Sequence, residues 1–137
     1  MQHRTIAGTM KTPPANFTGD VYLNTVAAAD DTSRLVVGLV RFTPGARTNW
    51  HSHANGQLLI CTDGAGVVAS RDGTVVSLQA GESVWTLPGE EHWHGARADQ
   101  MMCHYAILDE TDVGDATTWL EPVTDQQYAA AGATVSR

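Results

Sequence analysis

Residues 44–64 have the sequence PGARTNWHSHANGQLLICTDG. A Pro-Gly pair opens this stretch and Asp63-Gly64 closes it, and both pairs are typical of turns. Between the turns lie His51 and His53, one residue apart, with Gln57 four residues later. Alternate side chains of a strand point to the same face, so the two imidazoles would project toward one point. The stretch therefore predicts a strand that carries a cluster of metal ligands.

Short apolar runs separated by turns continue along the rest of the chain. Gly or Pro occurs almost every ten residues, and the runs between them are rich in Val, Leu, Ile and Thr, which is typical of strands. The pattern predicts an all-β sandwich or barrel over residues 21–124. Asp72-Gly73 predicts a hairpin with a two-residue type I′ turn. Strands are expected at residues 21–27, 34–42, 47–50, 57–62, 66–71, 74–78, 83–87 and 102–108.

The two ends of the chain differ from this central domain. Residues 1–20 include two consecutive prolines and few apolar positions, and they predict an arm that packs on the barrel or on a second subunit. At residues 125–137 we expect a short helix and tail, because residues 124–127 (TDQQ) match a capping box. This helix is expected to run through Ala130 and to end near Gly132.

Composition limits the class of protein. A chain of 137 residues has the length of one domain. Eight Lys and Arg against fifteen Asp and Glu give a net charge of -7, so we expect no nucleic-acid or membrane partner. Cys61 and Cys103 lie far apart, which favours reduced thiols, and no leader or spanning segment is recognisable, so a cytoplasmic location is expected. We expect a small-molecule substrate and a homo-oligomer, a dimer or a tetramer.

Five of the six histidines form one cluster of potential metal ligands: His51, His53, His92, His94 and His104. Neutral imidazole is the commonest nitrogen ligand of Zn, Mn, Fe, Ni and Cu. The turn at Pro88-Gly89 could deliver His92 from a distant part of the chain, and Gln57 adds a neutral oxygen ligand. We therefore predict a divalent metal site formed by His51, His53, Gln57 and His92.

The remaining two histidines are the candidate catalytic residues. Three imidazoles and one amide would leave a cation its full charge, so it would act as a Lewis acid on a substrate oxygen. His104 is the candidate base, and the alternative is a buried histidine bonded to a backbone carbonyl. His94 lies on the same face as His92, where it could be a fifth ligand, a substrate contact or a donor to a ligand.

Strand alternation also predicts the walls of a substrate pocket. If His104 points into the barrel, so do Ala106 and Leu108, and an apolar wall would keep this imidazole neutral. The predicted pocket residues are Gly38, Val40, Phe42, Thr48 and Leu108. Arg47 is expected to be solvated at a strand start. Large aromatic side chains dominate the cores of small sandwiches, so Trp50 and Trp85 are expected to pack there.

These residues resemble the two signature motifs of the cupin superfamily. The first motif is Pro44-Gly45 followed by His51-x-His53-x3-Gln57-x6-Gly64, and the second is Gly81 followed by Pro88-Gly89-x2-His92. Gln57 replaces the Glu that most cupins carry, and Ala96 replaces a common Asn. The resemblance implies a single-domain cupin, that is, a double-stranded β-helix or jelly-roll barrel, with a short C-terminal helix.

A closer resemblance is to the small bacterial cupins with hydroxynitrile lyase activity, from about residue 17 to residue 128. The matching stretches are 42–48 (FTPGART), His53-x3-Gln57, 88–95 (PGEEHWHG) and 123–128 (VTDQQY). This resemblance implies manganese, bound by His51, His53, Gln57 and His92, with His94 and His104 beside the substrate. Iron, zinc and nickel remain alternatives, because nitrogen ligands do not by themselves favour manganese.

The leading hypothesis is a metal-dependent lyase that cleaves or forms a carbon–carbon bond at a hydroxylated carbon, as a hydroxynitrile lyase does. One alternative is a non-haem metal dioxygenase. Gln57 argues against it, because an anionic ligand would help to stabilise higher oxidation states. The other alternative is a non-catalytic small-molecule binder in which the metal is structural.

Overall fold

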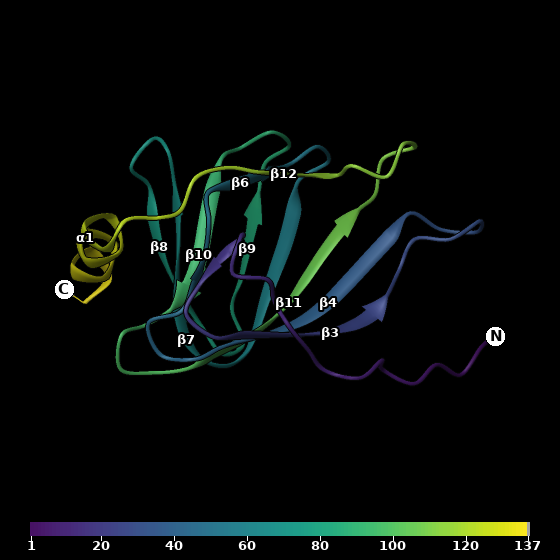
Figure 1. The fold of residues 1–137 in the computed structure, drawn as a ribbon, viewed down its shortest axis with the longest axis horizontal. Helices are drawn as coiled ribbons and strands as arrows, with labels where there is room; N and C mark the ends of the chain where they lie inside the picture. Colours follow the sequence, from purple (N-terminus) through teal and green to yellow (C-terminus); the bar gives the residue numbers. More distant parts are fainter. Residues whose placement is uncertain (137) are drawn as a thin grey trace.

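A computed structural model describes residues 1–136, which form one curled antiparallel barrel and a C-terminal helix (Figure 1). The helix α1 (Asp125–Val135) lies outside the barrel, at the end away from the N-terminus. The strands are β1 (Met10–Lys11), β2 (Phe17–Thr18), β3 (Val21–Ala27), β4 (Leu35–Phe42), β5 (Arg47–Thr48), β6 (His51–His53), β7 (Gln57–Ser70), β8 (Val75–Gln79), β9 (Ser83–Thr86), β10 (His92–Ala96), β11 (Met102–Asp109) and β12 (Thr117–Trp119).

Two sheets face each other, and β7 belongs to both. Its first half pairs with β11 and β9, and β4, β3 and β1 extend that first sheet. Its second half pairs with β10 and β8, and β5, β2, β6 and β12 complete the second sheet. All of these pairs are antiparallel, which is the arrangement of a jelly-roll barrel. The predicted all-β fold with a short C-terminal helix is confirmed.

The change of sheet within β7 occurs at Gly64. The sequence predicted two strands separated by a turn at Asp63-Gly64, whereas the chain bends there without reversing. Gly64 has φ +73°, and a Cβ at this position would lie 1.8 Å from the carbonyl oxygen of Met101. Only glycine tolerates both the positive φ and this close backbone approach. A bend of this kind uses the same residues as a turn, so local sequence could not distinguish the two.

The hairpin at Asp72-Gly73 is present, but its turn type differs from the prediction. Gly73 has φ +90°, and within residues 1–136 every residue with positive φ is a glycine, so Asp72 lacks the positive φ of a type I′ turn. The amide of Gly73 donates to Ser70 O at 3.1 Å, and the amide of Ser70 donates to Thr74 O at 3.0 Å. The loop thus has three residues and ends in a left-handed glycine, which is the next most common hairpin connection after the two-residue turns.

The helix begins as predicted and continues beyond the expected end. Thr124 and Gln127 form the reciprocal capping box, with distances of 3.1 Å and 2.9 Å. Gly132 lies inside the helix rather than after it. Ala131 and Val135 pack against a cluster that includes Trp93, and this tertiary packing offsets the low helix propensity of the glycine. No helix in residues 1–136 is long and apolar enough to cross a membrane.

The expectation that Arg47 is solvated is wrong, because its side chain is buried. Its guanidinium donates to Val123 O at 2.9 Å, contacts Asp125 at 2.7 Å and lies 4.7 Å from the centre of the Tyr128 ring. The returning C-terminal segment covers this arginine, and that contact spans more than seventy residues. Arg47 therefore fastens α1 to β5.

The two tryptophans behave differently from each other. Trp50 is buried in the cluster under α1, as predicted. Trp85 is 52% exposed, so the prediction that it packs in the core is wrong. It lies between Val84 and Thr86 on β9, and Val84 contacts the core while Thr86 is buried. Strand alternation thus places the indole of Trp85 on the outer face.

Residues 1–20 contain two strands that pair within the chain. Met10 of β1 lies opposite Leu23 at the edge of the first sheet. Phe17 of β2 lies opposite Thr48 in the second sheet. The segment before β1 continues alongside β3 (Figure 1), where the amide of Ala7 donates to Thr25 O at 3.4 Å and Asn24 Nδ2 donates to Ala7 O at 3.0 Å.

Candidate metal centre

Three imidazoles meet on two neighbouring strands of the second sheet. His51 and His53 occupy alternate positions of β6, and His92 of β10 lies directly opposite His51. Each ring offers one nitrogen, and these nitrogens lie within 4.8 Å of one another. All three side chains are buried, with exposed fractions of 1–3%. Strand alternation and the antiparallel register together therefore gather three of the predicted ligands at one point.

The other ring nitrogens of these histidines are held by oxygen atoms. His51 Nδ1 donates to Asn49 O and His92 Nδ1 donates to Glu90 O, each at 2.9 Å. A carbonyl oxygen can only accept a hydrogen bond, so both neutral rings carry their proton on Nδ1 and have a free lone pair on Nε2. This is the arrangement in which histidines bind metals.

Two further observations fit a cation at this point. His53 Nε2 is buried and has no hydrogen-bond partner within the described chain, which is costly unless another group satisfies it. His92 Nε2 lies 3.4 Å from Gln57 Oε1. With the proton of His92 on Nδ1, these two atoms are both acceptors, and a shared cation would satisfy both of them. The donor set thus fits a divalent metal.

A cavity of about 160 Å³ lies between the two sheets, and His51, His53 and Gln57 line it. Most of its wall is apolar, with side chains from both sheets. Four of the five predicted pocket residues line it, namely Val40, Phe42, Thr48 and Leu108. Gly38 is not among its lining residues, and Leu23 Cδ1 would lie 2.8 Å from a Cβ there. Leu23 thus occupies the space in front of Gly38.

The two candidate catalytic histidines form one hydrogen-bonded pair. His94 lines the cavity, whereas His104 is fully buried and is not among the lining residues. His104 Nε2 lies 3.0 Å from His94 Nδ1, and Phe42 packs against both rings. His94 Nε2 has no partner within the described residues. Of this pair, His94 is thus the member that lines the cavity.

Burial keeps these imidazoles neutral. Desolvation lowers the pKa of His53 and of His104 to about 4, and it holds the pKa of His51 and of His94 well below the ordinary value. The pKa of His92 is also lowered, again chiefly by burial. An apolar environment disfavours the imidazolium ion, and each ring disfavours the charge of its neighbours. Neutral rings are the form that binds a metal or accepts a proton.

Five residues that line the cavity were not predicted from the sequence: Thr12, Phe17, Leu23, Thr117 and Trp119. The last two contact the clustered histidines. Thr117 and Trp119 lie on β12, which pairs with β6. Thr117 Oγ1 lies 3.0 Å from His53 Nδ1, and the Trp119 ring centre lies 4.8 Å from that of His51. Their stretch has neither a histidine nor a long apolar run to draw attention to it. Only the antiparallel pairing brings it to the site.

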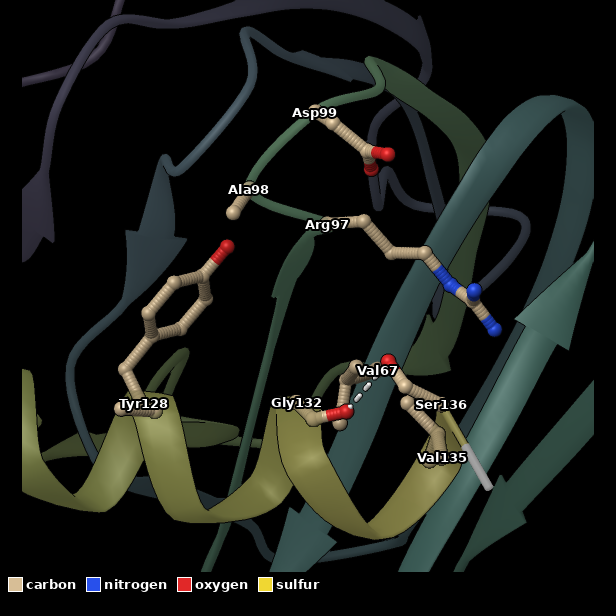
Figure 2. A pocket seen from close by; sticks show the side chains of 9 residues that line it. Val67, Arg97, Ala98, Asp99, Tyr128, Gly132, Val135 and Ser136 are labelled. Atoms are coloured by element: carbon tan, nitrogen blue, oxygen red, sulfur yellow. Dashed lines mark hydrogen bonds between the residues drawn. The ribbon is translucent and has the colours of Figure 1, made fainter.

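A larger cavity, of about 470 Å³, lies away from the histidines, between α1 and the barrel (Figure 2). Val67, Tyr128 and Val135 contribute apolar surface, and Arg97 lies at its side. The hydroxyl of Tyr128 donates to Ala96 O at 2.6 Å. None of the clustered histidines lines this cavity. Three of them, namely His51, His53 and His94, line the smaller one.

The fold and the three-histidine cluster define a small β-barrel protein with a metal-binding site between its sheets. The chain belongs to the cupin family: the model of the cupin domain matches residues 38–108. An (R)-mandelonitrile lyase from Granulicella tundricola is 44% identical over 118 residues, which cover 86% of this chain and 89% of that protein.

Solved structures agree with this assignment. A cupin-like protein from Thermotoga maritima superposes with a TM-score of 0.83 at 35% identity, over 88% of this chain and 91% of that chain. A cupin 2 conserved barrel domain protein from Rhodopseudomonas palustris superposes with a TM-score of 0.69 at 18% identity, over 91% of this chain and 82% of that one. The second likeness concerns the fold alone.

Proposed function

We propose that this cupin is a metal-dependent lyase that cleaves and forms the carbon–carbon bond of α-hydroxynitriles. The observation that carries the proposal is that one mainly apolar cavity is lined both by His51 and His53 of the three-histidine cluster and by His94, whose Nε2 has no partner within the described residues. A relative named as an (R)-mandelonitrile lyase, at 44% identity, supports the same chemistry. We further propose His51, His53, Gln57 and His92 as the ligands and manganese as the metal.

The chemistry that such a cation supplies when bound is Lewis-acid polarisation of the substrate hydroxyl, which lowers its pKa. The remaining requirements are a base for the hydroxyl proton and an environment that excludes water. His94 Nε2 meets the first requirement, because burial keeps the ring neutral. The apolar wall, which includes Val40 and Leu108, meets the second and leaves room for the organic part of the substrate.

The proposed cleavage conserves every atom and electron. The hydroxyl proton moves to His94 Nε2, and the electron pair of the O–H bond forms the second bond of the carbonyl group. The bond between the hydroxylated carbon and the nitrile carbon breaks, and its electron pair leaves with cyanide. Cyanide then takes the proton from His94, which gives hydrogen cyanide and an aldehyde. Synthesis of the hydroxynitrile is the reverse sequence.

His104 has a supporting role in this scheme. When His94 gains a proton on Nε2, its Nδ1 proton faces His104 Nε2 at 3.0 Å. A neutral imidazole accepts that hydrogen bond and stabilises the transient charge. The base that contacts substrate is thus His94, and His104 acts through it.

The test is to mix (R)- and (S)-mandelonitrile with protein loaded with Mn²⁺ and to follow benzaldehyde and cyanide together. We expect both products in equal amounts, above the rate in buffer, and a loss of that excess after treatment with a chelator. Parallel samples loaded with Fe²⁺, Zn²⁺ and Ni²⁺ identify the active metal. If no sample exceeds buffer, the lyase proposal is wrong. Oxygen uptake by the iron-loaded sample would favour the dioxygenase alternative.

A further inference from the structure

The three clustered histidines do not have the same kind of partner at Nδ1. Backbone carbonyl groups hold His51 and His92, through Asn49 O and Glu90 O. His53 is different, because its Nδ1 lies 3.0 Å from the hydroxyl oxygen of Thr117. This difference matters because a carbonyl only accepts a hydrogen bond, whereas a hydroxyl both donates and accepts.

The direction of the His53–Thr117 hydrogen bond decides whether His53 can bind a metal. If the Thr117 hydroxyl donates, Nδ1 has no proton and the neutral ring carries it on Nε2. If the hydroxyl accepts, the proton is on Nδ1 and the lone pair of Nε2 is free. The first form blocks the ligand position and the second form opens it. His53 is thus the ligand whose tautomer depends on a side chain.

We propose that Thr117 is a positioning residue of the metal centre: its hydroxyl accepts the Nδ1 proton of His53 and so keeps Nε2 free for a divalent cation. The inference rests on the proposed metal site, and it assigns to β12 a role that the histidine motifs do not contain. Partners of this kind orient metal-binding histidines and fix the tautomer. The buried, partnerless Nε2 of His53 is the atom that benefits.

The backbone around Thr117 is fixed firmly enough for this role. Thr117 lies opposite His53 in the β6–β12 pair. On one side, Ala116 O accepts from the amide of Ala54 at 2.7 Å, and the amide of Ala116 donates to the Glu110 carboxylate at 2.7 Å. The hydroxyl oxygen is therefore held opposite the imidazole by its own strand.

The other end of β12 is held in the same way. The amide of Leu120 donates to Trp50 O at 2.8 Å, and the amide of Trp50 donates to Glu121 O at 3.0 Å. Trp119 lies against the His51 ring. Two ligands of the proposed centre thus depend on one short strand that contributes no ligand itself.

The experiment measures metal affinity, so it does not depend on the reaction. The full chain is stripped with a chelator and titrated with Mn²⁺ in a calorimeter, as wild type and as Thr117→Val, Thr117→Ser and Thr118→Val. Val has nearly the shape of Thr without the hydroxyl, and Ser keeps the hydroxyl. Thr118 is exposed on the same strand, so its variant controls for the general effect of losing a threonine there.

We expect Thr117→Val to weaken Mn²⁺ binding by about 10-fold to 100-fold, the usual effect of losing such a partner. Thr117→Ser and Thr118→Val should bind like wild type. Equal affinity in wild type and in Thr117→Val would overturn the role of Thr117 alone. A wild-type protein that binds none of Mn²⁺, Fe²⁺, Zn²⁺ and Ni²⁺ would overturn both this inference and the proposed metal site.

A second measurement covers the case in which Thr117→Val does not fold. Nitrogen NMR of the Zn²⁺-loaded wild-type protein reports which ring nitrogen of His53 carries the proton. A proton on Nδ1 with the metal on Nε2 supports the inference. A proton on Nε2, or a metal on Nδ1, overturns it.

Discussion

At the scale of single residues, His94 lines the cavity and His104 lies buried behind it. Strand alternation groups His104 with Ala106 and Leu108, and all three face the interior or its cavity, but alternation could not predict that another imidazole would cover His104. The ring directions depend on packing against Phe42 and on a register shift between Cys103 and His104. Neither of these leaves a local signal in the sequence. The histidine spacing, in contrast, was sufficient to predict the three-histidine cluster.

The order of the two rings leads to a prediction about His94. His94→Ala should lower kcat for mandelonitrile cleavage by about 10²-fold to 10⁴-fold, which is the usual contribution of a general acid–base residue. Metal content per chain should stay at the wild-type value, because His94 is not part of the three-histidine cluster. Steady-state kinetics and elemental analysis of the same sample measure both. Full activity in the variant would mean that another group moves the proton.

At the scale of elements, the bend in β7 connects the two sheets that enclose the cavity. The Gly64→Ala variant should lose unfolding free energy for two reasons. A non-glycine residue at positive φ costs about 1–2 kcal/mol, and displacing the Met101 carbonyl adds about 1–3 kcal/mol of overpacking.

Gly73→Ala is the matched control for that prediction. Gly73 also has a positive φ, but a Cβ there would meet nothing within 4 Å. Its variant should therefore show only the first cost, about 1–2 kcal/mol. Urea unfolding of both variants and of wild type gives the comparison. Equal losses in the two variants would mean that the bend has no steric role.

Elements with a local signal were predicted well from the sequence, and elements fixed by distant partners were not. The capping box of α1 is contained in four consecutive residues, and the apolar runs of β3, β4 and β11 have clear ends. β12 has only three residues, and β6 is its strand partner from a distant part of the chain. The burial of Arg47 likewise depends on the return of the C-terminal segment. Such contacts depend on how distant segments are arranged in the fold, and the local propensity of a residue for helix or strand carries no information about that arrangement.

At the scale of the whole molecule, the buried histidines make stability depend on pH. In the unfolded chain an imidazole titrates near its ordinary pKa of 6.5, whereas burial lowers the pKa of His53 and of His104 to about 4. Between these values the unfolded chain binds protons that the folded chain does not. The contribution of these histidines to the free energy of unfolding is therefore at its full value above pH 6.5, and it decreases as the pH falls toward 4.

Urea unfolding of the metal-free protein at several pH values within this window measures the effect. His104→Leu replaces one of the buried imidazoles with an apolar side chain, and it should make the dependence on pH less steep. A free energy of unfolding that does not change across the window would contradict the prediction. It would show that these rings accept protons in the folded protein as readily as in the unfolded chain.

The position of His92 opposite His51 also has a consequence for stability. An ion bound by both side chains would cross-link β6 and β10 in the native protein, and this cross-link would be lost on unfolding. Ligands that bind only the native state add stability in proportion to the logarithm of their concentration over Kd. In a cell that lacks the ion, a larger fraction of the protein would then be unfolded and open to degradation. The supply of metal would thus set the amount of folded protein.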